Sequence, residues 1–524
     1  KGPPQISGEV AKIIAADELI ESAVAAGPYV NFKLKPAGLG KIALESILKG
    51  TFFQKPLLVQ TPKTMIEYSQ PNTHKELHVG HMRNACLGDA LVRTLRYAGV
   101  EVISSTFPGD VGTHVAKCLW YMKFRNTEPV PKEGRGEWLG QMYSKGHLQL
   151  EDETGTPKEA ENREKLTMIL QQLEEKKGEF YDLWLETRQW SIDLMQSVYG
   201  WMGIKFDQWY WESEVDSASL QYVKDLLAQG KLTRSEGAVG MDLSDVNLGF
   251  CLLMKSDGNG LYATKDLELA RRKFQDYKIQ KSIYVVDQRQ SLHFQQVFKT
   301  LERLGFEQAK DCFHLQYNFV ELPDGAMSSR KGNIVPIMAL IQNMQNMVKE
   351  NYLTRYKGEW SDEEIDLVAE QVAKGAIKYG MVKIDNNKKI VFDMKEWLKL
   401  EGDSGPFIQY STARISSLLK KLGPVQAAGT DWGLLTHTAE KKLMSHLLNY
   451  NVVVAQAAEN DRPSVLCTYL LEAAKKFNHF YHECSIGQAE TPALKNARLA
   501  LAQATREALV QGLSLLGIPA PERM

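Results

Sequence analysis

The sequence predicts an α/β protein built on a parallel sheet, with a small α+β unit before the sheet and an all-α bundle after it. Three observations lead to this fold class. An apolar strand pattern at 65–69 turns into a long helical pattern that reaches Ala98, and a second strand pattern follows at 100–104. A continuous apolar run at 283–287 is typical of a strand buried inside a parallel sheet. From residue 346 onward, long amphipathic patterns indicate helices throughout.

The chain of 524 residues is longer than one hydrophobic core supports, and we expect about three or four domains. We place a small leading domain at 1–60. A Rossmann-type catalytic domain follows at 61–345, because strand, helix and strand succeed one another there as a βαβ unit. Polar helical patterns at about 125–205 form an insertion in it, and 346–524 form the bundle. Long helices are expected near 362–383, 405–422, 436–458, 463–481 and 492–516.

Local turn signals predict two further features. A Gly-containing turn at 256–260 separates two short apolar segments, 253–255 and 261–264, and indicates a β-hairpin. The helix after it should begin near Thr264 and carry Asp266. In the leading domain, a turn and an alternating strand are expected over 26–34.

Composition narrows the class of protein. With 63 basic and 64 acidic residues, the net charge is −1, so a nucleic-acid partner would need a local basic face. The six cysteines are scattered without a CxxC pair, which makes zinc unexpected and suits a reducing, cytoplasmic location. No secretory signal opens the chain and no apolar run approaches a membrane span, so we expect no membrane contact. Residue 1 is Lys, and we expect a trimmed form.

The join between the first strand and its helix carries the most specific chemistry. His78, Val79, Gly80 and His81 follow a Pro-Asn turn, where free backbone N–H groups and the helix dipole favour phosphate. His78 and His81 share one helical face, and Gly80 lets a flat ligand approach the backbone. Two imidazoles that donate to developing negative charge suit attack on an α-phosphate. The alternative is a hydrogen-bonded surface pair at a helix start.

This run resembles the HIGH signature of class I aminoacyl-tRNA synthetases, and the wider stretch 68–95 is similar to the arginyl-tRNA synthetase family. The shared features are the Ser-x-Pro-Asn turn, a Lys before HxGH, and Arg and Gly-Asp in the helix. KGAIKYGMVK at 374–383 and PFIQYSTARI at 406–415 resemble further family segments. The resemblance implies ATP-dependent activation of L-arginine with Mg²⁺ and transfer to the 3′ end of tRNA-Arg. We expect a monomer.

An arginine substrate presents a fixed fork of donors, which calls for carboxylates placed to accept bidentate bonds. By resemblance, Tyr262 and Asp266 grip the guanidinium and Glu67 is the strand carboxylate. Asn72 and Gln290 match residues that hold the backbone end of the amino acid. Taken separately, Asp266 could be only a favourable charge at a helix N-terminus.

The nucleotide is expected across the switch point of the sheet. By resemblance, His78, Gly80 and His81 meet phosphate and ribose, while His293 and Met327 lie near the nucleotide. His293 could equally be a structural histidine.

The second class I signature, KMSKS, is altered here. In AMSSRKG, Ala326 and Ser329 occupy the positions of both lysines. The arginine family often places the lysine before HxGH instead, so Lys75 is expected to screen the phosphates. Ser328, Arg330 and Lys331 would assist it. The alternative is a degraded loop and an inactive enzyme.

Contacts with tRNA are expected at both ends of the chain. By resemblance, the leading domain touches the elbow of the tRNA, and flat or soft side chains of the bundle face anticodon bases. There are simpler explanations for the candidate residues. Those of the leading domain could be ordinary exposed strand residues, the aromatic ones of the bundle could be core residues, and its basic side chains could be ordinary solvated ones. The candidates are Tyr29 and Asn31 at the elbow, Tyr410, Arg414, Tyr481 and Met524 at the anticodon, and a basic face of Lys374, Lys378, Arg414, Lys420 and Lys421.

Two other functions stay open. The first is a related nucleotidyltransferase that activates a different small molecule, which the helical last third disfavours. The second is a non-catalytic RNA-binding or interaction protein, which only the missing KMSKS lysines favour.

Overall fold

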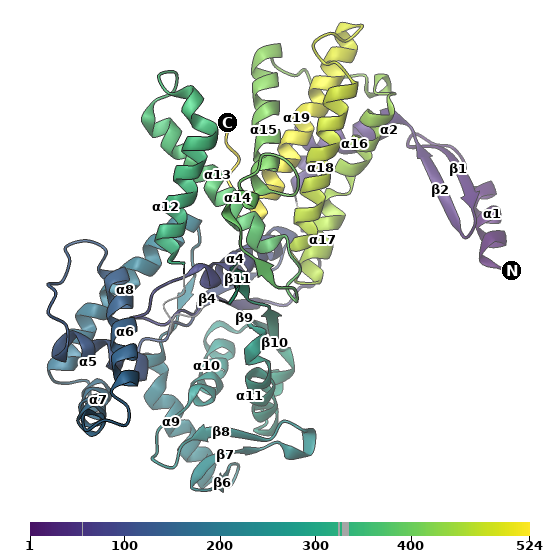
Figure 1. The fold of residues 1–524 in the computed structure, drawn as a ribbon. Coiled ribbons are helices and arrows are strands. Elements are labelled where there is room, and N and C mark those ends of the chain that lie inside the picture. Colours follow the sequence, from purple (N-terminus) through teal and green to yellow (C-terminus); the bar gives the residue numbers. More distant parts are fainter. Residues whose placement is uncertain (55, 323–324, 327–334) are drawn as a thin grey trace.

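The computed structural model describes residues 1–54, 56–322, 325–326 and 335–524. At its centre lies a five-stranded sheet in the order β10-β9-β3-β4-β5, and every pair in it is parallel (Figure 1). The strands are β3 (Thr64–Glu67), β4 (Val102–Thr106), β5 (Gln208–Trp209), β9 (Lys281–Asp287) and β10 (Cys312–Tyr317). This confirms the predicted α/β class.

The strand order reverses between β3 and β9. From β3 the chain continues through β4 to β5 on one side, and later returns to add β9 and β10 on the other. The loops that leave β3 and β9 therefore diverge, which opens a crevice at their carboxyl ends. The sheet thus places a ligand site where the first strand ends.

Helix α4 (Val79–Ala98) crosses the sheet and is buried along most of its length. It packs so closely that a Cβ on Gly88 would lie 2.1 Å from the ring of Tyr68. Gly99 ends the helix in a left-handed conformation, φ 103°, a common C-terminal stop. These contacts fix where the first turn of α4 opens onto the crevice.

A helical layer is inserted between β4 and β5. It consists of α5 (Thr113–Phe124), α6 (Arg135–Asp152), α7 (Lys158–Glu175) and α8 (Glu179–Met202). Helix α5 packs against α6 and α7, so the layer also includes residues before the predicted insertion.

Of the hairpin predicted over 253–264, the turn at 256–260 is present, with an antiparallel bridge between Met254 and Gly260. The second strand is not formed, because a helix begins at Tyr262. Strand β8 (Phe250–Met254) instead pairs with β7 (Ala238–Asp242), which pairs with β6 (Thr233–Ser235) in a separate antiparallel sheet. Helix α10 (Tyr262–Tyr277) begins directly after the turn, with Leu261 as its N-cap. Because the helix starts at Tyr262, Tyr262 and Asp266 lie one turn apart. Helices α9 (Glu212–Ala228) and α11 (Ser291–Arg303) complete this region.

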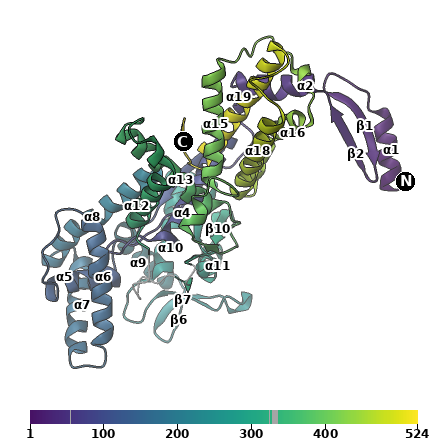
Figure 2. The same cartoon turned by 45° about the horizontal axis from the view of Figure 1, so that its top comes forward.

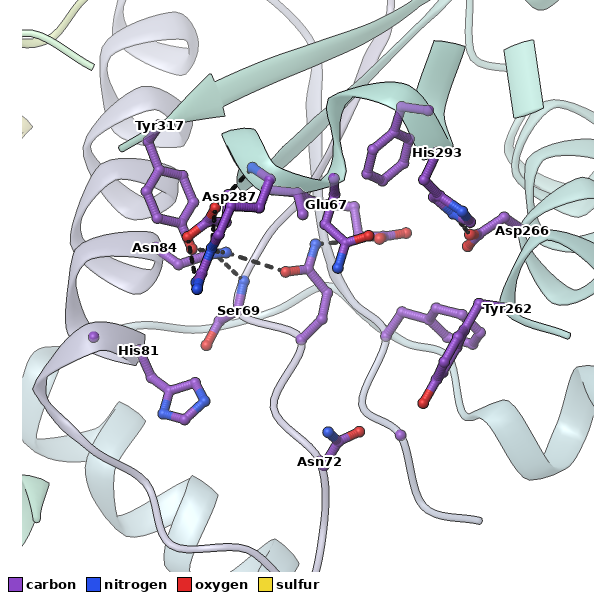
Figure 3. A pocket seen from close by; sticks show the side chains of 18 of the residues that line it. Glu67, Ser69, Asn72, His81, Asn84, Tyr262, Asp266, Asp287, His293 and Tyr317 are labelled. Atoms are coloured by element: carbon purple, nitrogen blue, oxygen red, sulfur yellow. Dashed lines mark hydrogen bonds and ion pairs between the residues drawn. The ribbon is translucent and has the colours of Figure 1, made fainter. Parts of the chain in front are cut away.

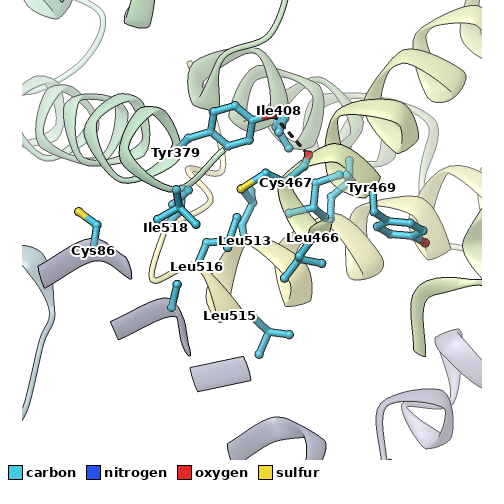
Figure 4. Packing of buried hydrophobic residues seen from close by; sticks show 14 of the residues in the cluster. Cys86, Tyr379, Ile408, Leu466, Cys467, Tyr469, Leu513, Leu515, Leu516 and Ile518 are labelled. Atoms are coloured by element: carbon cyan, nitrogen blue, oxygen red, sulfur yellow. Dashed lines mark hydrogen bonds between the residues drawn. The ribbon is translucent and has the colours of Figure 1, made fainter. Parts of the chain in front are cut away.

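The last third is mainly helical, with two differences from the prediction. The helix expected at 436–458 is divided at Asn449, and Ile390–Val391 forms a short strand, β13, beside β11 (Val320–Leu322). Figure 4 shows how its helices pack around buried aliphatic side chains such as Leu466 and Leu513. The helices are α12 (Ile337–Val348), α13 (Asp362–Val382), α14 (Met394–Trp397), α15 (Gly405–Leu422), α16 (Thr438–Leu448), α17 (Tyr450–Glu459), α18 (Ser464–Glu483) and α19 (Pro492–Leu515).

The leading residues form a small unit that projects from the bundle, as Figures 1 and 2 both show. Helix α1 (Pro3–Ile13) packs on an antiparallel pair, β1 (Ile20–Ala26) and β2 (Tyr29–Leu34). Of the turn and strand predicted over 26–34, the strand is present at Tyr29–Leu34. Within the described residues, no helix combines the length and the apolar character that crossing a bilayer requires.

Candidate active site

A cavity of about 800 Å³ opens at the switch point of the sheet (Figure 3). Its walls come from the loops after β3 and β9, the first turns of α4 and α10, and the turn after β4. Most of the predicted substrate residues line it. Those that do so are Glu67, Asn72, His78, Gly80, His81, Tyr262, Asp266, Gln290 and His293.

The loop from β3 to α4 is held in an unusual conformation. Ser69 and His74 both adopt positive φ, 55° and 58°, which is costly for residues with a side chain. The N–H of Ser69 donates to Asn84 Oδ1 at 2.6 Å. A Cβ on Gly109 would lie 2.3 Å from Asn72 Oδ1, so only glycine lets the turn after β4 approach Asn72 this closely.

Asn84 connects the loop to the sheet. Its amide nitrogen donates to Val285 O at 2.9 Å, to Gln70 Oε1 at 3.2 Å and to Tyr317 Oη at 3.2 Å. Asn84 lies on α4, six residues after His78, so one helix supplies both a pocket wall and the anchor of the preceding loop.

The two histidines cap the helix reciprocally. His78 Nδ1 accepts from the Gly80 N–H at 3.2 Å, and His81 Nδ1 accepts from the His78 N–H at 3.1 Å. A ring nitrogen that accepts carries no proton, so in each ring Nε2 holds it and is a donor. Burial, followed by the charge of Lys75, lowers the pKa of His78 to about 4; burial also lowers the pKa of His81 well below its ordinary value. Both rings are therefore neutral donors near pH 7.

The first turns of α10 form the opposite wall, where Figure 3 shows Tyr262 and Asp266. Tyr262 is 65 % exposed and Asp266 Oδ2 lies 2.5 Å from His293 Nε2. Burial opposes protonation of His293, but its hydrogen bond to Asp266 and the charge of that carboxylate raise its pKa above the ordinary value. His293, predicted near the nucleotide, thus contacts the predicted guanidinium carboxylate.

Glu67 lines the pocket from the end of β3, but its charge already has a partner. Glu67 Oε2 lies 2.5 Å from Nζ of Lys273, which is fully buried on α10. The ammonium of Lys273 also lies 3.8 Å from the centre of the Tyr284 ring. Gln70 donates to the other oxygen of Glu67 at 3.2 Å.

Glu212 is a pocket residue that sequence reasoning missed. It is 6 % exposed at the start of α9, and its Oε2 accepts from Lys265 Nζ at 3.2 Å. Burial raises the pKa of Glu212 to about 7, with a smaller contribution from the charges of Asp110 and Asp266 and opposition from Lys265. In the sequence it is one acidic residue at a helix start, with no signal to separate it from the others.

Lys75 lies outside the pocket lining, and its ammonium is 5.0 Å from the centre of the Tyr143 ring. Its charge contributes to the lowered pKa of both His78 and His81, so it acts at the histidine end of the pocket. Met327, Ser328, Arg330 and Lys331 lie outside the described residues.

The residues predicted to contact tRNA lie in three places. Tyr29 and Asn31 are exposed on β2, on one face of the strand. Arg414 on α15 donates to Tyr410 Oη at 3.3 Å, and its guanidinium lies 5.8 Å from the Tyr481 ring centre. The carbonyl of Met524 accepts from Tyr356 Oη at 3.0 Å.

One residue of the predicted basic face is not on the surface. Lys378 is fully buried on α13, and its Nζ donates to Asp89 Oδ2 at 2.7 Å. An ammonium is buried only when it is paired, and Asp89 on α4 supplies the partner. Lys378 therefore connects the bundle to the catalytic helix instead of facing solvent.

Comparison with known proteins agrees with the fold. Residues 44–394 match the family of class I tRNA synthetases (R), catalytic domain, and residues 408–524 match the DALR anticodon binding domain. The whole chain is 62 % identical over 522 residues to the arginine–tRNA ligase of Bdellovibrio bacteriovorus, of which it covers 89 %. It is 34 % identical over 528 residues to that of Clostridium acetobutylicum, covering 91 % of it.

Solved structures give the same result. The structure of Thermus thermophilus arginyl-tRNA synthetase superposes with a TM-score of 0.81 at 29 % identity, covering 100 % of this chain and 92 % of that one. That of the Plasmodium falciparum enzyme has a TM-score of 0.78 at 21 % identity, covering 99 % of this chain and 89 % of that one, and shows the shared fold. The chain belongs to the arginyl-tRNA synthetases, within class I of the aminoacyl-tRNA synthetases.

Proposed function

We propose that this pocket joins L-arginine to ATP as arginyl-adenylate and then transfers the arginyl group to the 3′ end of tRNA-Arg. One observation carries the proposal: a single cavity holds carboxylates on one wall and neutral imidazole donors on the other. The carboxylates suit a guanidinium, and the donors suit a phosphate.

In the first step, a carboxylate oxygen of arginine attacks the α-phosphorus of ATP. A new P–O bond forms, the bond to the β-phosphate oxygen breaks, and pyrophosphate leaves with the electron pair. His78 and His81 donate to the charge that develops on the phosphate, and Lys75 offsets it. Asp266 and Tyr262 hold the guanidinium, with Glu67 deeper in the pocket and Asn72 and Gln290 at the backbone end.

In the second step, a ribose hydroxyl of the tRNA attacks the arginyl carbonyl and loses its proton as the new ester bond forms. The bond between the carbonyl carbon and the phosphate oxygen breaks, and AMP leaves with the electron pair. Tyr29 and Asn31 would contact the elbow of the tRNA, and the cluster of Tyr410, Arg414 and Tyr481 would stack on anticodon bases. Met524 is proposed for the same anticodon surface.

Mg²⁺ enters this scheme with the nucleotide. Within the described ranges, no group of three or more His, Cys, Asp or Glu side chains is placed to hold a metal ion. We therefore assign the ion to the triphosphate, as Mg-ATP. Other proposed contacts of this nucleotide are Met327, Ser328, Arg330 and Lys331.

We also infer that the protein is a cytoplasmic monomer.

Arginine-dependent exchange of pyrophosphate into ATP, with and without tRNA-Arg, tests the proposal. We expect exchange with arginine in at least one condition and none with lysine, because lysine cannot form the bidentate bond. Asp266→Asn should raise the KM for arginine about 10- to 100-fold, the effect of losing one charge-assisted hydrogen bond. Absence of exchange in both conditions would contradict the proposal.

A further inference from the structure

The loop that carries Lys75 is attached to the helical insertion through His74. This histidine is fully buried, and its φ of 58° is in the left-handed region. Its N–H donates to Ser191 Oγ at 2.9 Å, and Nε2 pairs with Thr187 Oγ1 at 2.8 Å. Ser191 and Thr187 both belong to α8. The third partner, Thr73 Oγ1 at 2.9 Å from Nδ1, is its neighbour in the loop. A costly backbone conformation persists only where its surroundings impose it, and here two of the three partners come from the insertion.

A second insertion helix contacts the next residues of the loop. The backbone of α6 comes so close that a Cβ on Gly140 would lie 2.7 Å from the nitrogen of Glu76 and 2.8 Å from its Cα. Three residues later on the same helix, Tyr143 places its ring 5.0 Å from the ammonium of Lys75. Tyr143 is 6 % exposed, so its ring is fixed by packing.

The flexible side chain of Lys75 therefore meets a rigid aromatic face. A lysine has a four-carbon stem, and its ammonium is a point charge without directional preference. An aromatic face attracts a cation through its quadrupole and restricts where that cation lies. His74, immediately before Lys75, fixes where the stem begins, while Tyr143 fixes where it ends.

We propose that the helical insertion positions the ammonium of Lys75 in the active site. His74 and Tyr143 are the positioning residues that hold Lys75 for the nucleotide. The inference rests on the proposed function, because it assigns Lys75 to the phosphates of ATP. It adds a role for the insertion, whose helices α6 and α8 would set the position of a charge that they do not carry. The lowered pKa of both pocket histidines, to which Lys75 contributes, is consistent with this position.

Substitutions of Tyr143 test the idea by steady-state kinetics of pyrophosphate exchange in the full chain. Tyr143→Leu removes the aromatic face, and we expect the KM for ATP to rise and kcat to fall, with a combined loss in kcat/KM for ATP of about 3- to 30-fold. The KM for arginine should stay unchanged. Tyr143→Phe keeps the face and should retain kcat/KM for ATP within about twofold. A loss for arginine as large as for ATP would overturn the proposal.

A double-mutant cycle separates positioning from general damage. If Tyr143 acts through Lys75, adding Tyr143→Leu to Lys75→Ala should cause no further loss. Equal losses in both backgrounds would overturn the inference. Lys75→Ala alone tests the proposed function: if it leaves exchange unchanged, the role of Lys75 fails. If Lys75→Ala impairs pyrophosphate exchange but Tyr143→Leu does not, the positioning role of Tyr143 is wrong while the proposed function stands.

The His74 anchor provides a second variant, which keeps the test decisive if Tyr143→Leu does not fold. Thr187→Val is nearly isosteric and removes the hydroxyl partner of His74 Nε2. We expect kcat/KM for ATP to fall about 3- to 10-fold, the range for one hydrogen bond, with the KM for arginine unchanged. Thr167→Val, the same substitution at an exposed site on α7, is the matched control and should have no effect. Equal behaviour of the two variants would overturn the role of the anchor.

Discussion

The two ends of the pocket differ in the charge of their side chains: one end carries ion pairs, and the other carries neutral histidines. At the end formed by β3, α9 and α10, each carboxylate already has a cationic partner inside the protein. The pairs are Glu67 with Lys273, Asp266 with His293, and Glu212 with Lys265. At the end formed by α4, His78 and His81 are neutral, and each accepts a hydrogen bond from a backbone N–H through Nδ1.

The two ends therefore bind their ligands differently: the acidic end must exchange one ion-pair partner for another, whereas the histidine end offers donors that are already in place. A guanidinium that binds Asp266 competes with His293, so binding there is an exchange of partners. A phosphate that reaches His78 and His81 meets donors whose orientation the helix cap has already fixed, which is the arrangement that stabilises developing charge at least cost. Breaking a pair at the acidic end should therefore change stability and substrate affinity, whereas changing a histidine should change kcat.

The largest effect is expected at the acidic end, from Lys273→Met. The substitution leaves the buried Glu67 carboxylate without its cation, so we expect the free energy of unfolding to fall by ~3–5 kcal/mol. Denaturant unfolding followed by tryptophan fluorescence measures this. Adding Glu67→Gln should recover much of the loss, because the uncompensated charge is then gone.

A matched variant shows whether the loss of unfolding free energy depends on how many cations the buried carboxylate has as partners. Lys378→Met removes another fully buried lysine, but its partner Asp89 keeps Arg93 at 2.9 Å. We expect a smaller loss of unfolding free energy than for Lys273→Met. A larger loss would show that charge compensation is not what the Lys273 pair supplies.

At the histidine end, His78→Asn should lower kcat and spare the fold. Asn is a good N-cap, so the thermal midpoint should change little, whereas loss of the Nε2 donor should lower kcat for exchange by about 10²- to 10³-fold. His437 provides the control, because it caps α16 in the same way: its Nδ1 accepts from the Ala439 N–H at 3.2 Å. If His437→Asn lowered kcat equally, the effect would belong to helix capping.

The histidine end was largely predictable from sequence, and the reason is locality. Strand, turn, cap and helix occupy one continuous stretch, so His78, Gly80 and His81 could be placed at a helix start from hydrophobic periodicity and turn residues alone. The positions of Asp266 and Tyr262 on one wall came from resemblance, although the local reading put the helix start two residues late.

The acidic end could not be derived in full, because its partners are distant in sequence. Nothing near Glu67 indicates that Lys273, some 200 residues later, neutralises it, and nothing near Glu212 distinguishes a pocket carboxylate from a surface one. The same limit explains Lys378, which the pattern of α13 presents as one more solvated lysine until α4 brings Asp89 to it. Periodicity gives the face of a helix, but not what packs against that face.

The smallest effect is a pH dependence of arginine binding. It directly tests whether arginine replaces His293 as the partner of Asp266. Because the pKa of His293 is raised, the ring is protonated and paired with Asp266 at pH 6, and its pairing contributes stability that is lost as the pH rises through that pKa. Deprotonation frees Asp266 for the guanidinium, so the KM for arginine should fall a few-fold as the pH rises from 6 to 8. The neighbouring His314 has a pKa below its ordinary value, mainly through burial. His293→Gln should flatten the profile; a slope that persists in this variant would assign the titration to another group, with Glu212, whose pKa is about 7, the first to test.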